Sequence, residues 1–301
     1  MKAFCFKYLL NFHSPSGTSR GILKQKESWF IVIVQGDKFG IGECSLIKGL
    51  SPDPEESYEQ TLKKVCENIS DGYETLSLGL NYFPSILFGL ETAFRSFESF
   101  NPMVLFPSSF TKNKDSIPIN GLIWMGQKSF MISQIKEKIN AGFDCIKIKI
   151  GSLDFTTELE LIKNIRKEYS SKDLEIRVDA NCAFSFSKAL EKLKKLSDFS
   201  IHSIEQPIPT RQWEKMAFLC EKSPIAIALD EELINTGEDE KEKMLKTINP
   251  AYIILKPSLV GGLKKSEDWI NIAANNNVKW WATSALESNI CLLYTSPRPR
   301  D

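Results

Sequence analysis

The fold of this chain is decided by residues 145–150, which read CIKIKI. Side chains alternate between the two faces of a strand, so Lys147 and Lys149 point to one face and the three isoleucines to the other. The isoleucines predict a face that packs against helices. Two lysines on an inward face contribute nothing to packing, so we expect them at a functional site. A solvated edge strand is the alternative, but further strands are expected on both sides.

Outward from this stretch, short β-rich runs alternate with amphipathic helical stretches. The expected strands are 117–121, 145–150, 174–178, 201–205, 225–229, 251–255 and 278–283. Helices are expected between them, for example at 128–141, 155–169 and 263–275. Strands separated by helices form βαβ units with a parallel sheet. Seven such units favour an α/β fold of the TIM-like (β/α) barrel type over a doubly wound sheet.

Residues 1–110 follow a different pattern. Residues 29–34 read WFIVIV and predict a strand, and 35–43 predict a turn and a returning strand. Helices are expected at 52–69 and 84–99. Antiparallel strands followed by helices indicate an α+β module. We therefore expect a separate N-terminal α+β domain over residues 1–110, and a family resemblance in residues 42–51 adds the expectation that it is a capping domain over the barrel.

The remaining residues divide into a barrel and a tail. The barrel domain is expected at 111–290, but residues 285–301 are too few for a last helix and an eighth strand. The final stretch contains two prolines and no apolar periodicity. We therefore expect a truncated C-terminal barrel unit and a non-native or disordered tail at 291–301. Residues 13–21, rich in Ser and Gly, are expected to form either a mobile lid or a loop without function.

Composition excludes several classes of function. Lys plus Arg (38) equals Asp plus Glu (38), so no net charge favours nucleic acid or an anionic membrane. No apolar run approaches the ~20 residues of a membrane span. Seven scattered cysteines without a C-x-x-C pair argue against a disulfide framework or a zinc site. We expect a cytoplasmic protein that acts on a small molecule.

A charged or polar side chain stands at the C-terminal end of six successive expected strands. These residues are Lys149, Asp179, Glu205, Asp230, Lys256 and Ser284. Successive members are 25 to 30 residues apart, about one βα unit, so each lies at the barrel mouth where active sites form. The three acids can supply oxygen ligands to a hard divalent cation. Any one acid alone could instead cap a helix, but three at matched spacing favour a metal site.

Several short segments resemble the signature of the enolase superfamily, in its muconate lactonizing enzyme-type branch with lysines on strands two and six. They are Lys147-Ile148-Lys149, Asp179-Ala180-Asn181, Ile204-Glu205-Gln206-Pro207, Leu229-Asp230-Glu231 and Lys256-Pro257. Within this branch, three further segments resemble the o-succinylbenzoate synthase family of menaquinone biosynthesis. They are Gly42-Glu43-Cys44, Gly49-Leu50-Ser51 and Ser284-Ala285-Leu286-Glu287-Ser288. The resemblance extends to about residue 290.

The resemblance implies a reaction and a set of roles. The implied ligands of Mg²⁺ or Mn²⁺ are Asp179, Glu205 and Asp230. Lys149 is implied as the base that removes the proton α to a carboxylate and then helps to protonate the leaving hydroxyl. Lys256 is implied as the cation that stabilises the enediolate. Lys147 would neutralise the substrate carboxylate, and Ser284 would lie near its distal end. The implied reaction is dehydration of a 2-succinyl-6-hydroxycyclohexadiene carboxylate.

Other interpretations stay open on the sequence. Two lysines flanking an α-carbon also suit an N-acylamino acid racemase or a dipeptide epimerase of the same superfamily. An inactive metal-binding homologue is a further alternative, which the complete set of charged residues disfavours. Arg177 is expected either in an ion pair or at the substrate. The sequence is compatible with a homo-oligomer and does not determine it.

Overall fold

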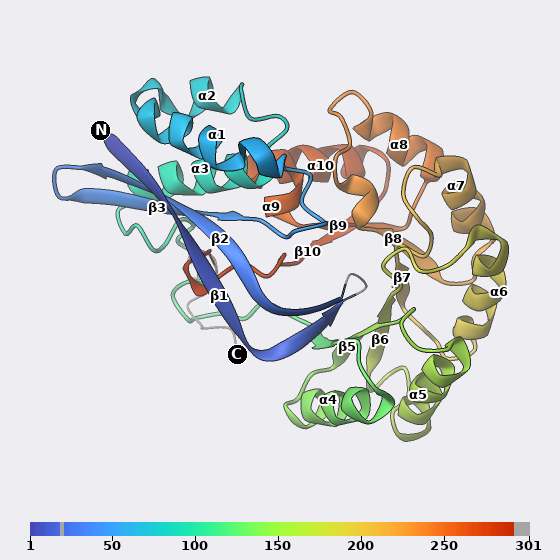
Figure 1. Ribbon diagram of the computed structural model, residues 1–301. Helices are drawn as coiled ribbons and strands as arrows, with labels where there is room; N and C mark the ends of the chain where they lie inside the picture. The colour runs from blue at the N-terminus through green and yellow to red at the C-terminus, as the bar shows by residue number, and fades with distance from the viewer. Residues whose placement is uncertain (19–20, 292–301) are drawn as a thin grey trace.

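The computed structural model describes residues 1–18 and 21–291, which form two sheets flanked by helices (Figure 1). One sheet has three strands and the other has seven. Of the tail expected at 291–301, only Cys291 lies among the described residues. None of the helices described there is long and apolar enough to cross a membrane.

The N-terminal sheet is antiparallel, with strand order β1-β2-β3. Its strands are β1 (Lys2–Thr18), β2 (Gly21–Gln35) and β3 (Lys38–Ser45). The strand expected at 29–34 is thus confirmed as part of β2, and it buries Ile31 and Ile33. The expectation of a loop at 13–21 is wrong for residues 13–18, which extend β1. Their pairing continues beyond an irregularity between Asn11 and Ser16, so backbone hydrogen bonding outweighs the Ser/Gly composition.

Helices pack on one face of this sheet (Figure 1). They are α1 (Glu55–Glu67), the short η1 (Ile69–Asp71), α2 (Gly72–Ser77) and α3 (Pro84–Glu98). The helices expected at 52–69 and 84–99 are confirmed. Helix α3 lies against β3 so closely that a Cβ on Gly42 would collide with the backbone oxygen of Gly89. Glycine at position 42 therefore permits this packing.

The second sheet is parallel, in the order β10-β9-β8-β7-β6-β5-β4. Its strands are β4 (Gly121–Ile123), β5 (Cys145–Lys149), β6 (Glu175–Asp179), β7 (Ser203–Glu205), β8 (Ala226–Leu229), β9 (Tyr252–Leu255) and β10 (Lys279–Ala282). Its helices are α4 (Lys128–Asn140), α5 (Phe155–Glu168), α6 (Phe186–Ser197), α7 (Trp213–Lys222), η2 (Glu231–Leu233), α8 (Lys241–Ile248), α9 (Pro257–Val260) and α10 (Leu263–Asn275). The sheet curves into a TIM-like partial barrel with helices on its outer side (Figure 1).

The expected strands and helices of this part are confirmed with one correction. The strand expected at 117–121 lies instead at Gly121–Ile123. Pro118 lacks the N–H that a sheet requires, and Ile117 and Ile119 are exposed, at 56% and 67%. Their alternation therefore does not mark a buried face.

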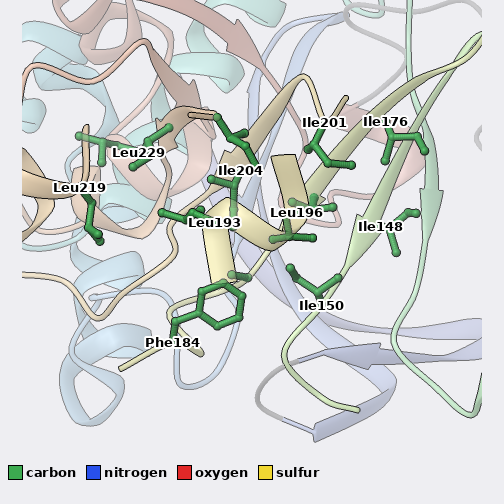
Figure 2. Close-up of a cluster of buried hydrophobic side chains, with 14 of the residues drawn as sticks. Ile148, Ile150, Ile176, Phe184, Leu193, Leu196, Ile201, Ile204, Leu219 and Leu229 are labelled. Carbon is green, nitrogen blue, oxygen red and sulfur yellow. The ribbon is translucent and has the colours of Figure 1, made fainter. Parts of the chain in front are cut away.

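The main core lies between the outer face of the parallel sheet and its helices (Figure 2). Ile148, Ile176 and Ile204 come from neighbouring strands and pack with Leu193 and Leu196 of α6. Each of these side chains is at most 1% exposed, and burial of one such side chain contributes about 1.5–3 kcal/mol. The apolar face predicted from residues 145–150 is confirmed, and it fixes the strands that carry the opposite, charged face.

The N-terminal module covers the C-terminal end of the parallel strands. Ile47 and Leu50 pack with Leu259 and Ala285, which follow the ends of β9 and β10. Glu91 of α3 accepts hydrogen bonds from the backbone N–H groups at the start of α10, with the nearest at 2.7 Å. The capping arrangement is therefore present, whereas the domain boundary near residue 110 stays a prediction.

A buried polar network also joins the cap to the segment after β10. Lys26 donates to the hydroxyls of Ser28 (2.9 Å) and Ser45 (2.8 Å), and its Nζ lies 3.5 Å from Glu43. Glu43 accepts from Ser28 (2.7 Å) and from the backbone N–H and hydroxyl of Ser288 (2.8 and 2.6 Å). Lys26 is 5% exposed and Glu43 is fully buried. The network thus places a compensated ion pair at the cap–barrel junction.

Glu43→Gln is expected to lower the free energy of unfolding by roughly 3–5 kcal/mol, because it leaves the Lys26 ammonium buried without a carboxylate. Urea denaturation measures this difference. The double variant Lys26→Met/Glu43→Gln removes both charges and is expected to recover much of the loss. A single variant as stable as the unmodified protein would contradict the role assigned to the pair.

Candidate active site

Three acids meet at the C-terminal ends of adjacent strands. Asp179 and Glu205 are the last residues of β6 and β7 and are paired in register, and Asp230 directly follows β8. Each offers a carboxylate oxygen within 4.8 Å of the other two, and all three are buried. The predicted convergence of these carboxylates is confirmed.

The predicted lysines lie in the same cluster. Lys147 Nζ is 2.5 Å from Glu205 Oε2 and 3.2 Å from Asp179 Oδ2. Lys149 Nζ is 3.1 Å from Asp179 Oδ2, and Lys256 Nζ is 2.5 Å from Asp230 Oδ2. Because β5 to β9 are consecutive in the sheet, Lys149 and Lys256 stand at opposite ends of the row of acids.

Ser284 occupies the loop after β10, the strand next to β9. The topology therefore puts it on the Lys256 side of the row of acids. Its neighbour Ala285 is buried against Ile47 of the cap. Whether Ser284 contacts the substrate stays a prediction.

Burial and crowding of like charges determine the electrostatics of the cluster. Burial raises the pKa of Glu205 to about 8, and the charges of Asp179 and Asp230 add to the rise while Lys147 opposes it. Burial acts on the pKa of Asp179 in the same direction, but Lys147 and Lys149 outweigh it and hold this pKa below its usual range. Burial alone would lower the pKa of Lys147 and of Lys256, but the neighbouring carboxylates raise both. The acids repel one another strongly enough that added positive charge would be favourable.

The row of acids fits a divalent cation. Glu205 Oε1 is buried and has no hydrogen-bond partner in the described part of the chain, which is costly for a carboxylate oxygen. The converging donors are all carboxylate oxygens, the ligands that hard divalent cations prefer. An oxygen left without a partner at this point is what a metal ligand requires.

Gln206 connects the segments that follow β7 and β8, next to Glu205 and Asp230, a role that sequence reasoning did not assign. Its side-chain oxygen accepts from the backbone N–H groups of Asp230 (3.3 Å) and Glu232 (3.2 Å). Its side-chain nitrogen donates to Glu232 Oε2 (3.1 Å) and to the backbone oxygen of Ile208 (3.1 Å). This amide therefore fixes the loops after β7 and β8 relative to each other. The sequence signals were its position beside Glu205 and its place in the segment Ile204-Glu205-Gln206-Pro207.

Asn181 and Glu231 are two further polar residues to which sequence reasoning gave no role. Asn181 Oδ1 accepts from Lys149 Nζ at 2.8 Å, and Asn181 Nδ2 donates to Glu231 Oε1 at 2.9 Å. Asn181 lies two residues after Asp179, and Glu231 directly follows Asp230. The sequence therefore places both residues near the row of acids but does not indicate what they do. Their hydrogen bonds connect Lys149, at the end of β5, to Glu231, which follows Asp230 at the other end of the row of acids.

Arg177 belongs to a separate group lower in the barrel. Its Nε donates to Glu175 at 2.6 Å, and its guanidinium lies 4.6 Å from the ring centre of Trp281. Of the two alternatives raised for Arg177, the structure shows an ion pair, and the partner is Glu175.

Comparisons with known proteins agree with this geometry. Residues 131–296 match the family of enolase C-terminal domain-like proteins. An o-succinylbenzoate synthase from Desulfotalea psychrophila is 43% identical over 316 residues, covering 94% of this chain and 85% of that protein. An L-amino acid-D/L-Glu epimerase from Sulfurimonas denitrificans is 28% identical over 178 residues, covering 58% and 50%.

Among solved structures, MenC from Desulfotalea psychrophila superposes with a TM-score of 0.87 at 39% identity. The match covers 98% of this chain and 89% of that one. The cap, the parallel sheet and the row of acids thus occur in a chain that resembles this relative along nearly its whole length. The chain belongs to the enolase superfamily.

Proposed function

We propose that the protein is an o-succinylbenzoate synthase, a metal-dependent hydro-lyase that dehydrates a cyclohexadiene carboxylate. The observation that carries the proposal is the position of Lys149 and Lys256 at opposite ends of the row of acids. A substrate carboxylate at the row would place its α-carbon between the Lys149 amine and the Lys256 ammonium. The identity of 43% over 94% of the chain supports the same reaction.

Asp179, Glu205 and Asp230 would hold the cation, and Mg²⁺ or Mn²⁺ suits an all-carboxylate set of ligands. When bound, the cation supplies positive charge beside the substrate carboxylate, which offsets the negative charge that develops as the α-proton leaves. Gln206 keeps the segments that follow β7 and β8, next to Glu205 and Asp230, in place.

The lysines divide the remaining work. Lys149 removes the proton from the carbon next to the carboxylate and returns it to the leaving hydroxyl, so water departs and the free amine is restored. Lys256 places a fixed positive charge on the opposite side, where negative charge develops. Lys147, buried between Asp179 and Glu205, neutralises the substrate carboxylate, and Ser284 contacts the distal end of the substrate.

One observation favours epimerisation as a second candidate. Two lysines at opposite ends of the row suit removal of a proton on one face and its return on the other. The epimerase relative shares this superfamily at lower identity. Dehydration uses Lys256 as a charge, whereas epimerisation uses it as a second acid or base, so the two reactions separate in an exchange experiment.

The location and assembly of the protein stay predictions. All seven cysteines are free thiols, which fits a reducing compartment, and we place the protein in the cytoplasm. A homo-oligomer is compatible with this function.

Glu205→Gln is expected to abolish stabilisation by Mg²⁺, because it removes one of three ligand charges. At a Mg²⁺ concentration 100 times the dissociation constant, the unmodified protein gains about 2.7 kcal/mol in the free energy of unfolding. Thermal unfolding with and without Mg²⁺ measures the gain. Glu175→Gln is the matched control, because this acid lies on the same sheet outside the row. Equal stabilisation of the Glu205 variant would contradict the metal site.

Lys149→Ala is expected to lower exchange of the substrate α-proton with solvent by roughly 10²–10⁴-fold, the usual cost of a lost general base. Lys256→Ala is expected to lower dehydration by roughly 10²–10³-fold through loss of a preorganised charge. Both losses fall on kcat. Deuterium incorporation and product formation, followed by NMR, measure them.

The exposed Lys128 provides a control, and Lys128→Ala should leave both rates unchanged. Near-normal exchange in Lys149→Ala would show that the base is misassigned. Equal exchange defects in the Lys149 and Lys256 variants would instead favour the two-base epimerase.

A further inference from the structure

We propose that Asn181 and Glu231 are positioning residues for Lys149. A hydrogen-bond chain runs from Lys149 through the Asn181 side chain to Glu231, and it orients the Lys149 amine so that one of its N–H bonds, or its lone pair, points to the substrate. The proposal deepens the proposed function and rests on Lys149 being the base. Neither residue needs to touch the substrate or the metal for this role. Glu231 acts on Lys149 only through Asn181.

The chain is short, buried and continuous. Lys149 Nζ donates to Asn181 Oδ1 at 2.8 Å, and Asn181 Nδ2 donates to Glu231 Oε1 at 2.9 Å. Asn181 and Glu231 are each 9% exposed. The backbone of Asn181 has φ of +41°, a region that Asn tolerates better than most residues, and its N–H donates to Asp179 Oδ1 at 3.0 Å. Hydrogen bonds therefore fix both the backbone and the side-chain amide of Asn181.

The direction of the chain follows from its two ends. A lysine amine donates through its N–H groups and Glu231 Oε1 accepts, so the amide between them has to turn its oxygen to Lys149 and its nitrogen to Glu231. Glu231 Oε2 has no hydrogen-bond partner in the described part of the chain. A proton on this carboxyl would therefore reside on Oε2 and leave Oε1 an acceptor. The amide orientation holds in either protonation state.

This arrangement orients the reactive nitrogen. Lys149 Nζ donates to Asp179 Oδ2 (3.1 Å) and to Asn181 Oδ1 (2.8 Å). An ammonium has three N–H groups, and a neutral amine has two N–H groups and one lone pair. With two acceptors fixed, the third position carries the proton in the ammonium and the lone pair in the amine. Asn181 thus aims the lone pair that removes the substrate proton.

The test compares variants of the full-length chain in steady-state dehydration. Glu231→Leu and Asn181→Leu are each expected to lower kcat by roughly 10- to 100-fold, the scale of a lost hydrogen bond to a charged group, with KM changed by less than about twofold. Glu231→Gln keeps an oxygen acceptor of the same length and is expected to stay within about threefold of the unmodified kcat. This matched pair separates loss of the acceptor from loss of the charge.

A double variant tests whether the two residues act in series. Asn181→Leu/Glu231→Leu is expected to be no slower than Asn181→Leu alone, because Glu231 has no path to Lys149 without the amide. Multiplied losses would overturn the chain. Calorimetric titration with Mg²⁺ alone is expected to give unchanged affinity, and a loss of affinity equal to the loss of kcat would overturn positioning in favour of a role at the metal.

A structural measurement separates this proposal from the proposed function. A crystal structure of Glu231→Leu is expected to show Lys149 Nζ or the Asn181 amide displaced, and an undisturbed contact near 2.8 Å would overturn the proposal. An unmodified protein that forms no product refutes the proposed function. In that case, the crystal structure alone tests whether Glu231 and Asn181 position Lys149.

Discussion

Repulsion among three buried carboxylates is the interaction that the rest of the structure has to accommodate. Asp179, Glu205 and Asp230 hold oxygens within 4.8 Å of one another and are almost inaccessible to solvent. Removing one charged group from water costs several kcal/mol, so such a row requires compensating charge nearby. Lys147, between two of the acids, supplies part of it, and a divalent cation would supply more. The affinity of the row for positive charge is thus a direct consequence of how closely the strands bring the acids together.

A parallel sheet can hold these acids close together against their repulsion. Hydrogen-bonded neighbours keep Asp179 and Glu205 in register, so the acids cannot separate without breaking the sheet. The opposite face resists movement as well, because Ile148 and Ile204 are packed in the main core. The alternation in residues 145–150 therefore serves two purposes at once: one face stabilises the strand, and the other presents charge.

The sequence predicted most of the barrel and the charged row because both depend on regular spacing. Period-two alternation located the strands, and one βα unit between successive charges placed those charges at one end of the sheet. The approach failed at residues 117–121, where apolar alternation misled, and in residues 13–18, where composition misled, because backbone pairing determines strand ends. Side-chain hydrogen bonds between residues distant in sequence could not be predicted either. The direction of the Asn181 amide depends on Glu231, 50 residues away, and no local pattern encodes it.

The cap and the barrel hold different parts of the site. The ends of the strands position the lysines and acids, whereas Ile47 and Leu50 of the cap contact Leu259 of α9 and Ala285 of the loop after β10. Leu259 and Ala285 lie outside the paired residues of the parallel sheet. In the proposed function, the row of acids and lysines would support α-proton removal, and residues outside the strands would select the substrate. A synthase and an epimerase both resemble this chain. In the function proposed for this chain, dehydration and epimerisation differ in what Lys256 does and not in where it stands.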